Sequence, residues 1–381
     1  MATSFSSSKL LEEKYTNLEF LDLGTYNLHD ENVGRAISRC LKYCINLKEV
    51  IFGVNHVSQS LGMSGRQKMC DESAKALGGS LKYCINLKYI NFDFYGVSNE
   101  GQIAIFDSIK YLKQLTYLRL NSEYISHEAA EVLCQSIKDL KHLTYLDLSS
   151  NNINDDGAKA IANPLEVLKN LMYLDLGFNN IGDEGAKALA EAIKSCQKLK
   201  RFDVCCNNIG DKGVESLYRS IRSCPKLKIL DISGRDINIS GKGIKALCRA
   251  LEGCAHFTRL DFSYIGINDE HAKALAESFK YCTNITSLSL QFHKISDEGI
   301  KAFIDHSENF AHLKYLDLDY ESPGSSNYAP LDGDTFSKES LHKLLMKLPN
   351  SCTVYHTKVS AFLRYKKGKY KGLLGSDISI K

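Results

Sequence analysis

A repeat with a period of 28 residues is the feature that most constrains the fold of this chain. Residues 143–170 read LTYLDLSSNNINDDGAKAIANPLEVLKN, and residues 171–198 read LMYLDLGFNNIGDEGAKALAEAIKSCQK. Both follow the pattern L-x-x-L-x-L-x-x-N-x-I, then a short acidic turn and an Ala-rich stretch. A period in this range indicates stacked structural units rather than a single globular core. The first apolar positions of eleven units are Leu18, Leu47, Leu87, Leu115, Leu143, Leu171, Leu199, Leu227, Phe257, Ile285 and Leu313.

The departures from this period set the expected domain boundaries. Leu47 and Leu87 are 40 residues apart, and the surplus is the polar, Gly-containing segment 59–70, which falls between the second strand and its helix. Insertions of this kind often carry binding contacts, and they can also be tolerated drift in a loop. We expect an N-terminal cap over residues 1–17 and eleven repeats over 18–320. An insertion and C-terminal cap repeat would follow over 321–357, with a basic tail over 358–381.

Each unit has the pattern of one strand followed by one returning helix. Leu146 and Leu148 alternate with Tyr145 and Asp147, which is the period of a strand. A buried Asn151 can donate to carbonyls that the turning backbone leaves unpaired. Asp183 is a candidate helix N-cap, ahead of an amphipathic stretch. Strands pack more closely than helices, so the stack must curve into an α/β horseshoe solenoid, with a parallel β-sheet on the concave side and α-helices on the convex side.

These units resemble leucine-rich repeats of the ribonuclease-inhibitor-like class. The stretch LDLGFNNIGDEGAKALAEAI, residues 174–193, is close to the consensus of that class, and the resemblance covers about four-fifths of the chain. It implies a solenoid fold. It does not imply one function, because proteins of this class serve many unrelated partners.

Most of the 13 cysteines fall into two columns of the aligned repeats. One column contains Cys44, Cys84, Cys196, Cys224, Cys254 and Cys282, and other repeats place Leu or Phe there. Cys134 and Cys248 share a second column with alanines. Positions that accept Cys, Leu, Phe or Ala are expected to be buried apolar sites with free thiols. Cys205 and Cys206 follow a strand instead, and could be reactive or metal-binding, although the sequence shows no partner ligand for them.

Strand alternation identifies the side chains that a partner would meet on the concave face. One column is rich in Asp and the column two residues earlier is rich in Tyr, with further aromatic residues just beyond the strands. The predicted protein-binding residues are Tyr89, Tyr117, Arg119, Tyr145, Asp147, Tyr173, Asp175, Phe178, Asp203, Asp231, Asp261, Tyr264, Phe292, Tyr315 and Asp317.

Two interpretations of this surface remain open. The Asp column can simply keep the sheet solvated, and a ladder of Tyr can stabilise parallel strands by ring packing. Alternatively, aromatic anchors beside an acidic lane would bind a protein partner with a basic surface. We take a non-enzymatic protein–protein interaction scaffold as the leading hypothesis.

Composition argues against partners other than proteins. The net charge of +3 gives little drive toward nucleic acid or anionic membranes, and no apolar run is long enough to span a bilayer. The odd cysteine count and the absence of a visible export signal favour a cytoplasmic protein. We expect a monomer that needs no cofactor or metal and has no membrane or nucleic-acid partner.

Two alternative functions rest on single segments. GTPase-activating proteins for the GTPase Ran use a similar horseshoe, and the turn SGRDIN at residues 233–238 is the nearest match to their Arg- and Asn-containing turn. It lacks the second Arg of that motif, and the tail here is basic rather than acidic. The tail has five basic residues between Arg364 and Lys371 and two Tyr, which could give weak RNA or acidic-surface binding. No sequence motif of a phosphate loop, zinc protease or serine hydrolase is present.

Overall fold

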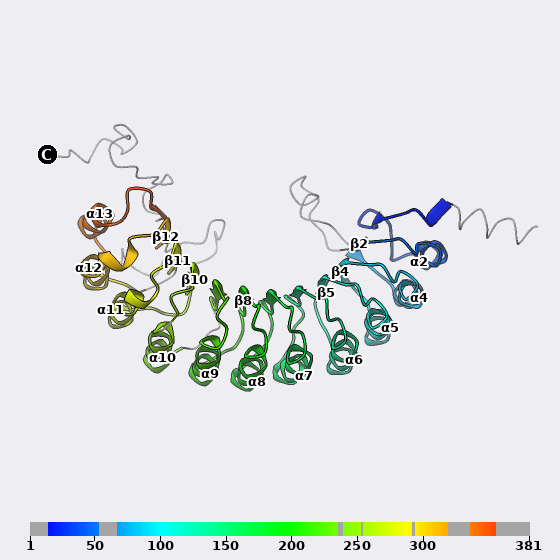
Figure 1. Cartoon of the computed structure of the whole chain (residues 1–381), viewed down its shortest axis with the longest axis horizontal. Coiled ribbons are helices and arrows are strands. Elements are labelled where there is room, and N and C mark those ends of the chain that lie inside the picture. The colour runs from blue at the N-terminus through cyan, green and yellow to red at the C-terminus, as the bar shows by residue number, and fades with distance from the viewer. Residues whose placement is uncertain are drawn as a thin grey trace, which may run out of the picture. The chain divides into compact units, whose positions relative to one another are not determined.

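The computed structural model describes residues 14–52, 67–234, 239–252, 254–291, 294–318 and 336–355. The chain divides into two units. The first comprises residues 1–208 and 219–226, and the second comprises residues 209–218 and 227–381. In both units parallel strands alternate with helices, which confirms the predicted leucine-rich-repeat α/β solenoid (Figure 1). None of the described helices combines the length and the apolar character needed to span a bilayer.

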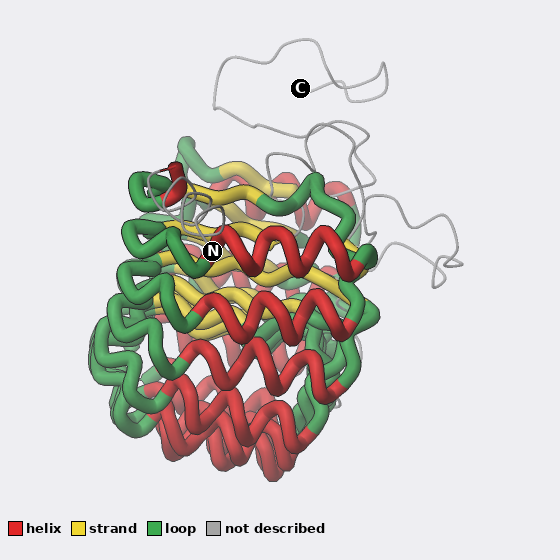
Figure 2. The backbone as a smooth tube through the Cα atoms, turned by 90° about the vertical axis from the view of Figure 1, so that its right-hand side faces the viewer, coloured by secondary structure: helices red, strands yellow, loops and turns green. Residues whose placement is uncertain are grey.

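The first unit is one parallel sheet covered by helices on a single side (Figure 2). Its strands are paired in the order β1, β2, β4, β5, β6, β7, β8, and β3 pairs with the far end of β4. The strands are β1 (Phe20–Asp22), β2 (Glu49–Phe52), β3 (Gln67–Lys68), β4 (Tyr89–Tyr95), β5 (Tyr117–Asn121), β6 (Tyr145–Asp147), β7 (Tyr173–Asp175) and β8 (Arg201–Asp203). The helices are α2 (Glu31–Leu41), α4 (Asp71–Leu81), α5 (Asn99–Ile109), α6 (His127–Ile137), α7 (Asp155–Leu165) and α8 (Asp183–Ile193). Helix α9 (Asp211–Ile221) contains the boundary between the units.

Apolar periodicity explains why these segments form a strand and a helix. Leu146 and Leu174, at the centres of β6 and β7, are fully buried, whereas the residues before them, Tyr145 and Tyr173, are only partly buried. The buried residues of α8 include Leu189 and Ile193, which lie four residues apart on one helical face. The core therefore lies between the sheet and the helices, and no described helix or strand covers the other side of the sheet. We call this uncovered side the open face.

A ladder of buried asparagines holds the turns that follow the strands. Asn179 is buried and donates to the carbonyl oxygens of Leu148 at 3.0 Å and Leu176 at 2.9 Å. Its side-chain oxygen accepts from the backbone nitrogen of Asn151 at 3.0 Å. Asn151 repeats this role one unit earlier by donating to the carbonyl oxygen of Leu120 at 2.7 Å. The predicted role of the buried Asn is confirmed.

The expectation that Asp183 caps its own helix is wrong. The N-cap of α8 is Gly182, and Asp183 is the first helical residue. The start of α8 is satisfied by Asp155 of the preceding repeat, whose Oδ1 accepts from the backbone nitrogens of Gly182 at 2.6 Å and Gly185 at 2.9 Å. A Cβ at Gly185 would lie 2.7 Å from the same Asp155 oxygen, so glycine permits this close approach. Capping between repeats cannot be recognised from one repeat alone.

The expectation for the two cysteine columns is confirmed. Cys44, Cys84, Cys134, Cys196, Cys224, Cys248, Cys254 and Cys282 are all buried with free thiols. Burial raises the pKa of Cys84 and of Cys134 to about 12, so both remain uncharged thiols near neutral pH. These cysteines act as small hydrophobic residues in the core. Cys205 and Cys206 are only partly buried, as their place after β8 predicts.

The second unit repeats the same arrangement. Its strands β9 (Ile229–Asp231), β10 (Arg259–Asp261), β11 (Ser287–Ser289), β12 (Tyr315–Asp317) and β13 (Thr353–Tyr355) pair in parallel in that order. Its helices are α10 (Gly241–Leu251), α11 (Asp269–Ser278), α12 (Asp297–Asp305) and α13 (Lys338–Lys347), with short 3-10 helices η1 (Phe279–Tyr281) and η2 (Ser307–Phe310).

Several sequence predictions fall on segments outside the described residues. These are Phe292, the turn residue Arg235, the first part of the 59–70 insertion and the basic tail. The last residues of the insertion are described: Gln67 and Lys68 form β3, and Met69 is fully buried. Cys70 then serves as the N-cap of α4. The insertion thus rejoins the repeat array before α4 begins.

Candidate functional site on the open face of the first unit

Four tyrosines at equivalent positions of β4 to β7 form a continuous stack. The strands pair with Tyr89 opposite Tyr117, Tyr117 opposite Tyr145, and Tyr145 opposite Tyr173. The ring centroids of these three pairs lie 4.1, 4.0 and 4.0 Å apart, with interplanar angles of 16°, 14° and 7°. Because equivalent residues are direct neighbours in parallel strands with this register, one Tyr in each repeat builds the stack. The predicted ring packing of the tyrosine column is therefore present.

The stack ends on a guanidinium group. Arg201 on β8 lies opposite Tyr173, and its guanidinium carbon is 5.2 Å from the centre of the Tyr173 ring. This distance is within the range of a cation–π contact. Burial raises the pKa of the Tyr145 and Tyr173 phenols above their ordinary value. Both phenols are therefore neutral near pH 7 and can donate hydrogen bonds.

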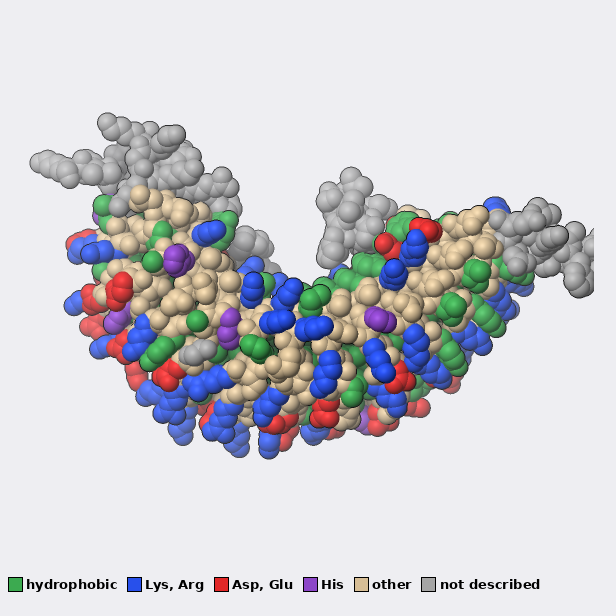
Figure 3. Space-filling view, viewed as in Figure 1, with side chains coloured by type: hydrophobic (Ala, Val, Ile, Leu, Met, Phe, Trp, Pro, Cys, Tyr) green, Lys and Arg blue, Asp and Glu red, His purple; other side chains and the backbone are tan. Residues whose placement is uncertain are grey.

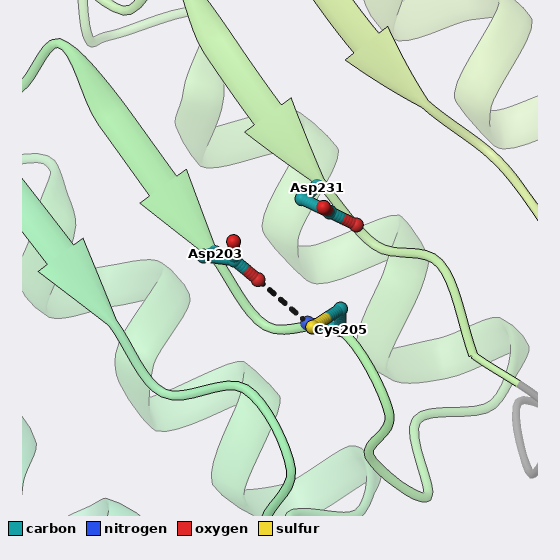
Figure 4. Close-up of side chains that lie close together, drawn as sticks. All are labelled: Asp203, Cys205 and Asp231. Atoms are coloured by element: carbon teal, nitrogen blue, oxygen red, sulfur yellow. Dashed lines mark hydrogen bonds between the residues drawn. The ribbon is translucent and has the colours of Figure 1, made fainter. Parts of the chain in front are cut away.

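The Asp column lies beside this stack and has a structural role in every described repeat that carries it, apart from the last. Oδ1 of Asp147 accepts from the backbone nitrogen of Ser149 at 3.0 Å, and Oδ1 of Asp175 accepts from that of Gly177 at 2.9 Å. Asp203 makes the same bond to the backbone nitrogen of Cys205 at 3.1 Å (Figure 4). Asp22, Asp231 and Asp261 repeat it at 2.8, 3.0 and 3.2 Å. Each of these carboxylates holds the turn that leaves its strand.

Two of the three neighbouring carboxylates in the first unit are paired with arginines. Arg119 Nε lies 3.4 Å from Asp147 Oδ2, and Arg201 Nη2 lies 2.9 Å from Asp203 Oδ2. The side chains of Asp147 and Asp203 are only 8% and 4% exposed. We call the row of Asp147, Asp175 and Asp203 the acidic lane. It is less exposed and less uniformly acidic than the sequence suggested, because Arg119 pairs with the carboxylate at one end and Arg201 with the carboxylate at the other.

Asp175 lies between these two pairs, opposite Asp147 on one side and Asp203 on the other. Among the described residues no Lys, Arg or His forms an ion pair with it; its partners are the Gly177 nitrogen and the Tyr173 hydroxyl, which donates at 3.0 Å. Burial, and then repulsion from Asp203 and Asp147, raise the pKa of Asp175 to about 7. The two hydrogen bonds oppose this rise without cancelling it.

Asp175 lacks a hydroxyl donor that three of its counterparts receive, because a glycine follows it two residues later. Oδ1 of Asp147 also accepts from the Ser149 hydroxyl at 2.7 Å, and Asp231 and Asp261 receive the same bond from Ser233 at 2.6 Å and Ser263 at 2.7 Å. Gly177 holds the equivalent position after β7 and has no hydroxyl to donate. Asp175 is therefore the carboxylate of this lane whose negative charge is least stabilised within the described residues.

The other predicted residues lie in different settings. Phe178 follows β7, is 61% exposed and has a positive φ of 54°. In the second unit Asp231, Asp261, Tyr264 and Asp317 are partly buried, and Tyr315 is 50% exposed. The side chain of Gln291 donates to Asp317 Oδ2 at 2.6 Å. Among the described residues of the second unit no ring stack continues the tyrosine column, because the equivalent positions on β9 to β11 are Ile229, Arg259 and Ser287.

Sequence reasoning missed three features of the site: the Arg119–Asp147 and Arg201–Asp203 pairs, the turn bonds of the Asp column, and the place of Arg201 at the end of the stack. The turn bonds had a signal in the sequence, because Asp is followed two residues later by Ser in three repeats and by Gly in two. Arg201 occupies the Tyr column one repeat after Tyr173, so its stacking could also have been anticipated.

Comparison with known proteins agrees with the repeat architecture. Four segments match the family model described as Leucine Rich repeat, at residues 139–162, 167–190, 195–217 and 281–303, together about a quarter of the chain. These segments are leucine-rich repeats, a class that generally mediates protein–protein interaction. No curated protein gave a significant match.

Solved structures also match this chain, among them one titled Leiomodin-1 Actin-Binding Site 2 (ABS2). It is 17% identical to this chain, with a TM-score of 0.33, and the match covers 40% of this chain and 87% of that one. A likeness at this level carries no argument about function.

Proposed function

We propose that this chain is a non-enzymatic protein-binding repeat protein, and that the open face of its first unit takes a cationic side chain of the partner at Asp175. The observation that carries this proposal is the arrangement of three carboxylates between two arginines. Asp147 and Asp203 each have an internal guanidinium partner, and Asp175 between them has none among the described residues. A Lys or Arg of the partner would give Asp175 the cationic neighbour that Asp147 and Asp203 already have.

The electrostatics favour such a partner. A carboxylate that is partly buried beside two others is destabilised in its charged form, which is why its pKa rises to about 7. A cation placed against it relieves the repulsion and favours ionisation. The bond would form in partly dehydrated surroundings, where loss of one member of a hydrogen-bonded charge pair typically costs about 2–5 kcal/mol.

The neighbouring rings would add contact area. Tyr145 and Tyr173 form the wall beside Asp175, and their faces are occupied by the stack, so a partner would meet ring edges and hydroxyls. Phe178 lies three residues after Asp175 and presents most of its side chain to solvent. Its positive φ belongs to the turn of the repeat, because Ser150, Cys206 and Tyr264 hold the equivalent place and share it. Aromatic anchors of this kind dominate many interfaces.

The test compares partner capture by matched single variants of the full chain. Wild type, Asp175→Asn and Asp261→Asn would each be used as bait in a cell lysate with mild cross-linking, followed by mass spectrometry. Asp261 is a suitable control because it makes the same turn bond as Asp175 on β10 of the second unit. Recombinant partners would then be titrated by calorimetry. We expect at least a tenfold loss of affinity for Asp175→Asn and little change for Asp261→Asn.

A double-mutant cycle would identify the cation. Substituting Ala for each interface Lys and Arg of the partner should reveal one residue whose effect disappears in the Asp175→Asn background. If every captured protein binds Asp175→Asn as tightly as wild type, the open-face site is wrong. No observation in the described residues favours GTPase activation through Arg235 or RNA binding through residues 364–381, since both segments lie outside them.

A further inference from the structure

The edge of the first unit where helices end and strands begin exposes apolar side chains in three consecutive repeats. Ile45 is 46% exposed, Tyr83 is 43%, Ile85 is 54% and Tyr111 is 46%. These residues lie in the loops that lead from α2, α4 and α5 to the next strand. Ile45, Tyr83 and Ile85 belong to the duplicated sequence LKYCINLK, in which the Cys and Leu side chains are buried and the Tyr, Ile and Lys side chains are partly or largely exposed.

The loops lie side by side at this edge. The Asn86 side chain donates to the carbonyl oxygen of Ile45 at 2.9 Å, and the backbone nitrogen of Lys88 donates to that of Lys48 at 2.7 Å. The backbone nitrogen of Thr116 continues the series by donating to the carbonyl oxygen of Lys88 at 2.9 Å. Because equivalent residues of adjacent strands pair without an offset, each repeat brings its loop to the same level. Equivalent loops are therefore neighbours, and we describe the exposed apolar side chains that they carry as one strip.

Lysines accompany this strip. The C-cap residues of α2, α4, α5, α6 and α8 are Lys42, Lys82, Lys110, Lys138 and Lys194. A cation at a helix C-terminus stabilises the helix, which accounts for this column. Helix capping does not account for the other lysines of these loops, Lys48 and Lys88, which directly precede β2 and β4. Figure 3 shows Lys and Arg side chains spread over the face toward the viewer, with Asp and Glu side chains among them.

Internal ion pairs neutralise only part of this charge. Lys48 is paired with Glu19 at 2.6 Å and Lys110 with Asp107 at 2.6 Å. Lys42, Lys82 and Lys88 have no acidic partner within 4.0 Å among the described residues. Lys82 lies 5.3 Å from the ring centre of its neighbour Tyr83. A shallow groove of about 550 Å³ is lined by Lys48, Lys88, three Asn and Gln114, and also by Glu19, whose carboxylate is the one that pairs with Lys48. Ammonium and amide donors around such a groove suit the phosphate of a headgroup.

The composition of the edge discriminates between classes of anionic partner. Protein interfaces are depleted in Lys, and recognition of nucleic-acid bases and phosphates relies heavily on the fork geometry of Arg. Here the cations are lysines, and aliphatic Ile45 and Ile85 lie among them. Lysines with aromatic and aliphatic side chains on one surface are typical of peripheral contact with an anionic bilayer.

We propose that this edge of the first unit, centred on Ile45, Tyr83, Ile85, Lys82 and Lys88, is a peripheral docking surface for anionic lipid bilayers. This surface is distinct from the open face and does not depend on the function proposed above. The expectation that the chain has no membrane partner rested on its net charge of +3, which averages over regions of opposite character. The Ile side chains insert at the headgroup level and the lysines contact lipid phosphates and carboxylates.

Vesicle sedimentation with the purified full chain tests the proposal. The probes are vesicles of phosphatidylcholine alone and vesicles that also contain phosphatidylserine. Three double variants are compared with wild type: Ile45→Ser with Ile85→Ser, Lys82→Gln with Lys88→Gln, and the charge-matched control Lys187→Gln with Lys273→Gln on exposed positions of α8 and α11. All substitutions are at exposed positions, and circular dichroism confirms that each variant is folded.

Wild type and the control should sediment with phosphatidylserine vesicles and not with phosphatidylcholine alone, and added salt should weaken the binding. Each edge lysine near an anionic bilayer contributes about fivefold, so Lys82→Gln with Lys88→Gln should lose roughly 25-fold in partitioning. The double Ile variant should lose at least roughly tenfold. The proposal is overturned if wild type does not bind phosphatidylserine vesicles. It is also overturned if both edge variants bind them like the control, because binding would then come from another part of the chain, such as the tail. Retention of RNA that depends on the lysines but not on the Ile pair, without vesicle binding, would also overturn it.

Discussion

The open faces of the two units share one scaffold but differ in what is built on it. In both units an Asp at the end of the strand accepts from the backbone nitrogen two residues later, as Asp175 and Asp261 do. Within the part of the chain that the structure describes, only the first unit adds a stack of four tyrosines, which ends at Arg201. In the second unit the corresponding Arg259 is 52% exposed and approaches Asp261 only to 4.0 Å. The Asp column is therefore architecture, and the stack is what makes part of it unusual.

The tyrosine stack changes the electrostatic environment of the Asp carboxylates beside it. In the first unit Arg201 and Asp203 approach to 2.9 Å with the carboxylate almost fully buried. The stacked rings beside these carboxylates exclude water, so charges there interact more strongly than they would on an open sheet. The same residue type, Asp, can consequently be a simple turn residue in one repeat and a perturbed acid in another.

Removing one ring from the stack should produce the largest difference in stability between the two units. Tyr145→Ala deletes two ring contacts and opens the middle of the stack, which should lower the free energy of unfolding by about 3 kcal/mol. Tyr315→Ala, at the equivalent exposed position of the second unit, should cost less than about 1 kcal/mol. Hydrogen-exchange mass spectrometry of peptides covering β6 and β7 would report the local loss.

Tyr145→Phe is the control for that experiment, because it keeps the ring and removes only the hydroxyl. Its exchange rates should stay near those of wild type. Equal losses for Tyr145→Ala and Tyr315→Ala would show that the stack contributes nothing beyond ordinary burial.

Asp175→Asn should remove an electrostatic penalty that depends on pH. The pKa of Asp175 rises to about 7 in the folded state from its ordinary value of 3.8, so between these values the folded state holds a proton that the unfolded state has lost. Stability therefore falls as pH rises from about 4 to 7, and the penalty is complete above pH 7. Allowing for solvent access, we expect Asp175→Asn to raise stability by about 2 kcal/mol at pH 8 and little at pH 4.

Denaturant unfolding at a series of pH values measures this difference. The groups that face Asp175 are Tyr145 and Asp147 on β6, Tyr173 on its own strand, and Arg201 and Asp203 on β8. Asp261→Asn should show no comparable gain at pH 8, since the second unit lacks the stack. A gain of the same size at pH 4 and pH 8 would show that charge is not its cause.

Gly177→Ser should produce the smallest effect, by supplying the hydroxyl donor that Asp147, Asp231 and Asp261 already have. An added donor stabilises the ionised carboxylate, so the pKa of Asp175 should fall by roughly one. The new Cβ would lie 2.8 Å from the sulfur of Cys205, and Cys205→Ser combined with it tests for that contact. Carbon-detected NMR titration of the Asp175 carboxyl gives the pKa directly, and an unchanged value would refute the missing-donor explanation.

The repeat explains why much of this structure could be predicted from the sequence. The roles of Asn151 and of the Cys84 column could be predicted because each residue type recurs at the same place in several repeats and meets the same surroundings there. Tyrosine stacking follows from the period and strand alternation. The pairing of Arg119 with Asp147 could not be read from the period, because it depends on which way a long side chain turns between two neighbours. The perturbed charge of Asp175 required knowing the absent hydroxyl at Gly177 together with both paired neighbours.

The capping bonds between repeats give the solenoid a direction. Asp71 accepts from the backbone of Ser98 at the start of α5, Asp155 does so for α8, and Asp269 accepts from Ser296 at the start of α12. In each case the earlier repeat completes the later helix, and nothing equivalent runs backwards among these bonds. Loss of one repeat would therefore leave its successor with an unsatisfied helix start while its predecessor stayed complete. When the chain is made from its N-terminus, α5, α8 and α12 each form next to a repeat that already supplies the acceptor for their first turn.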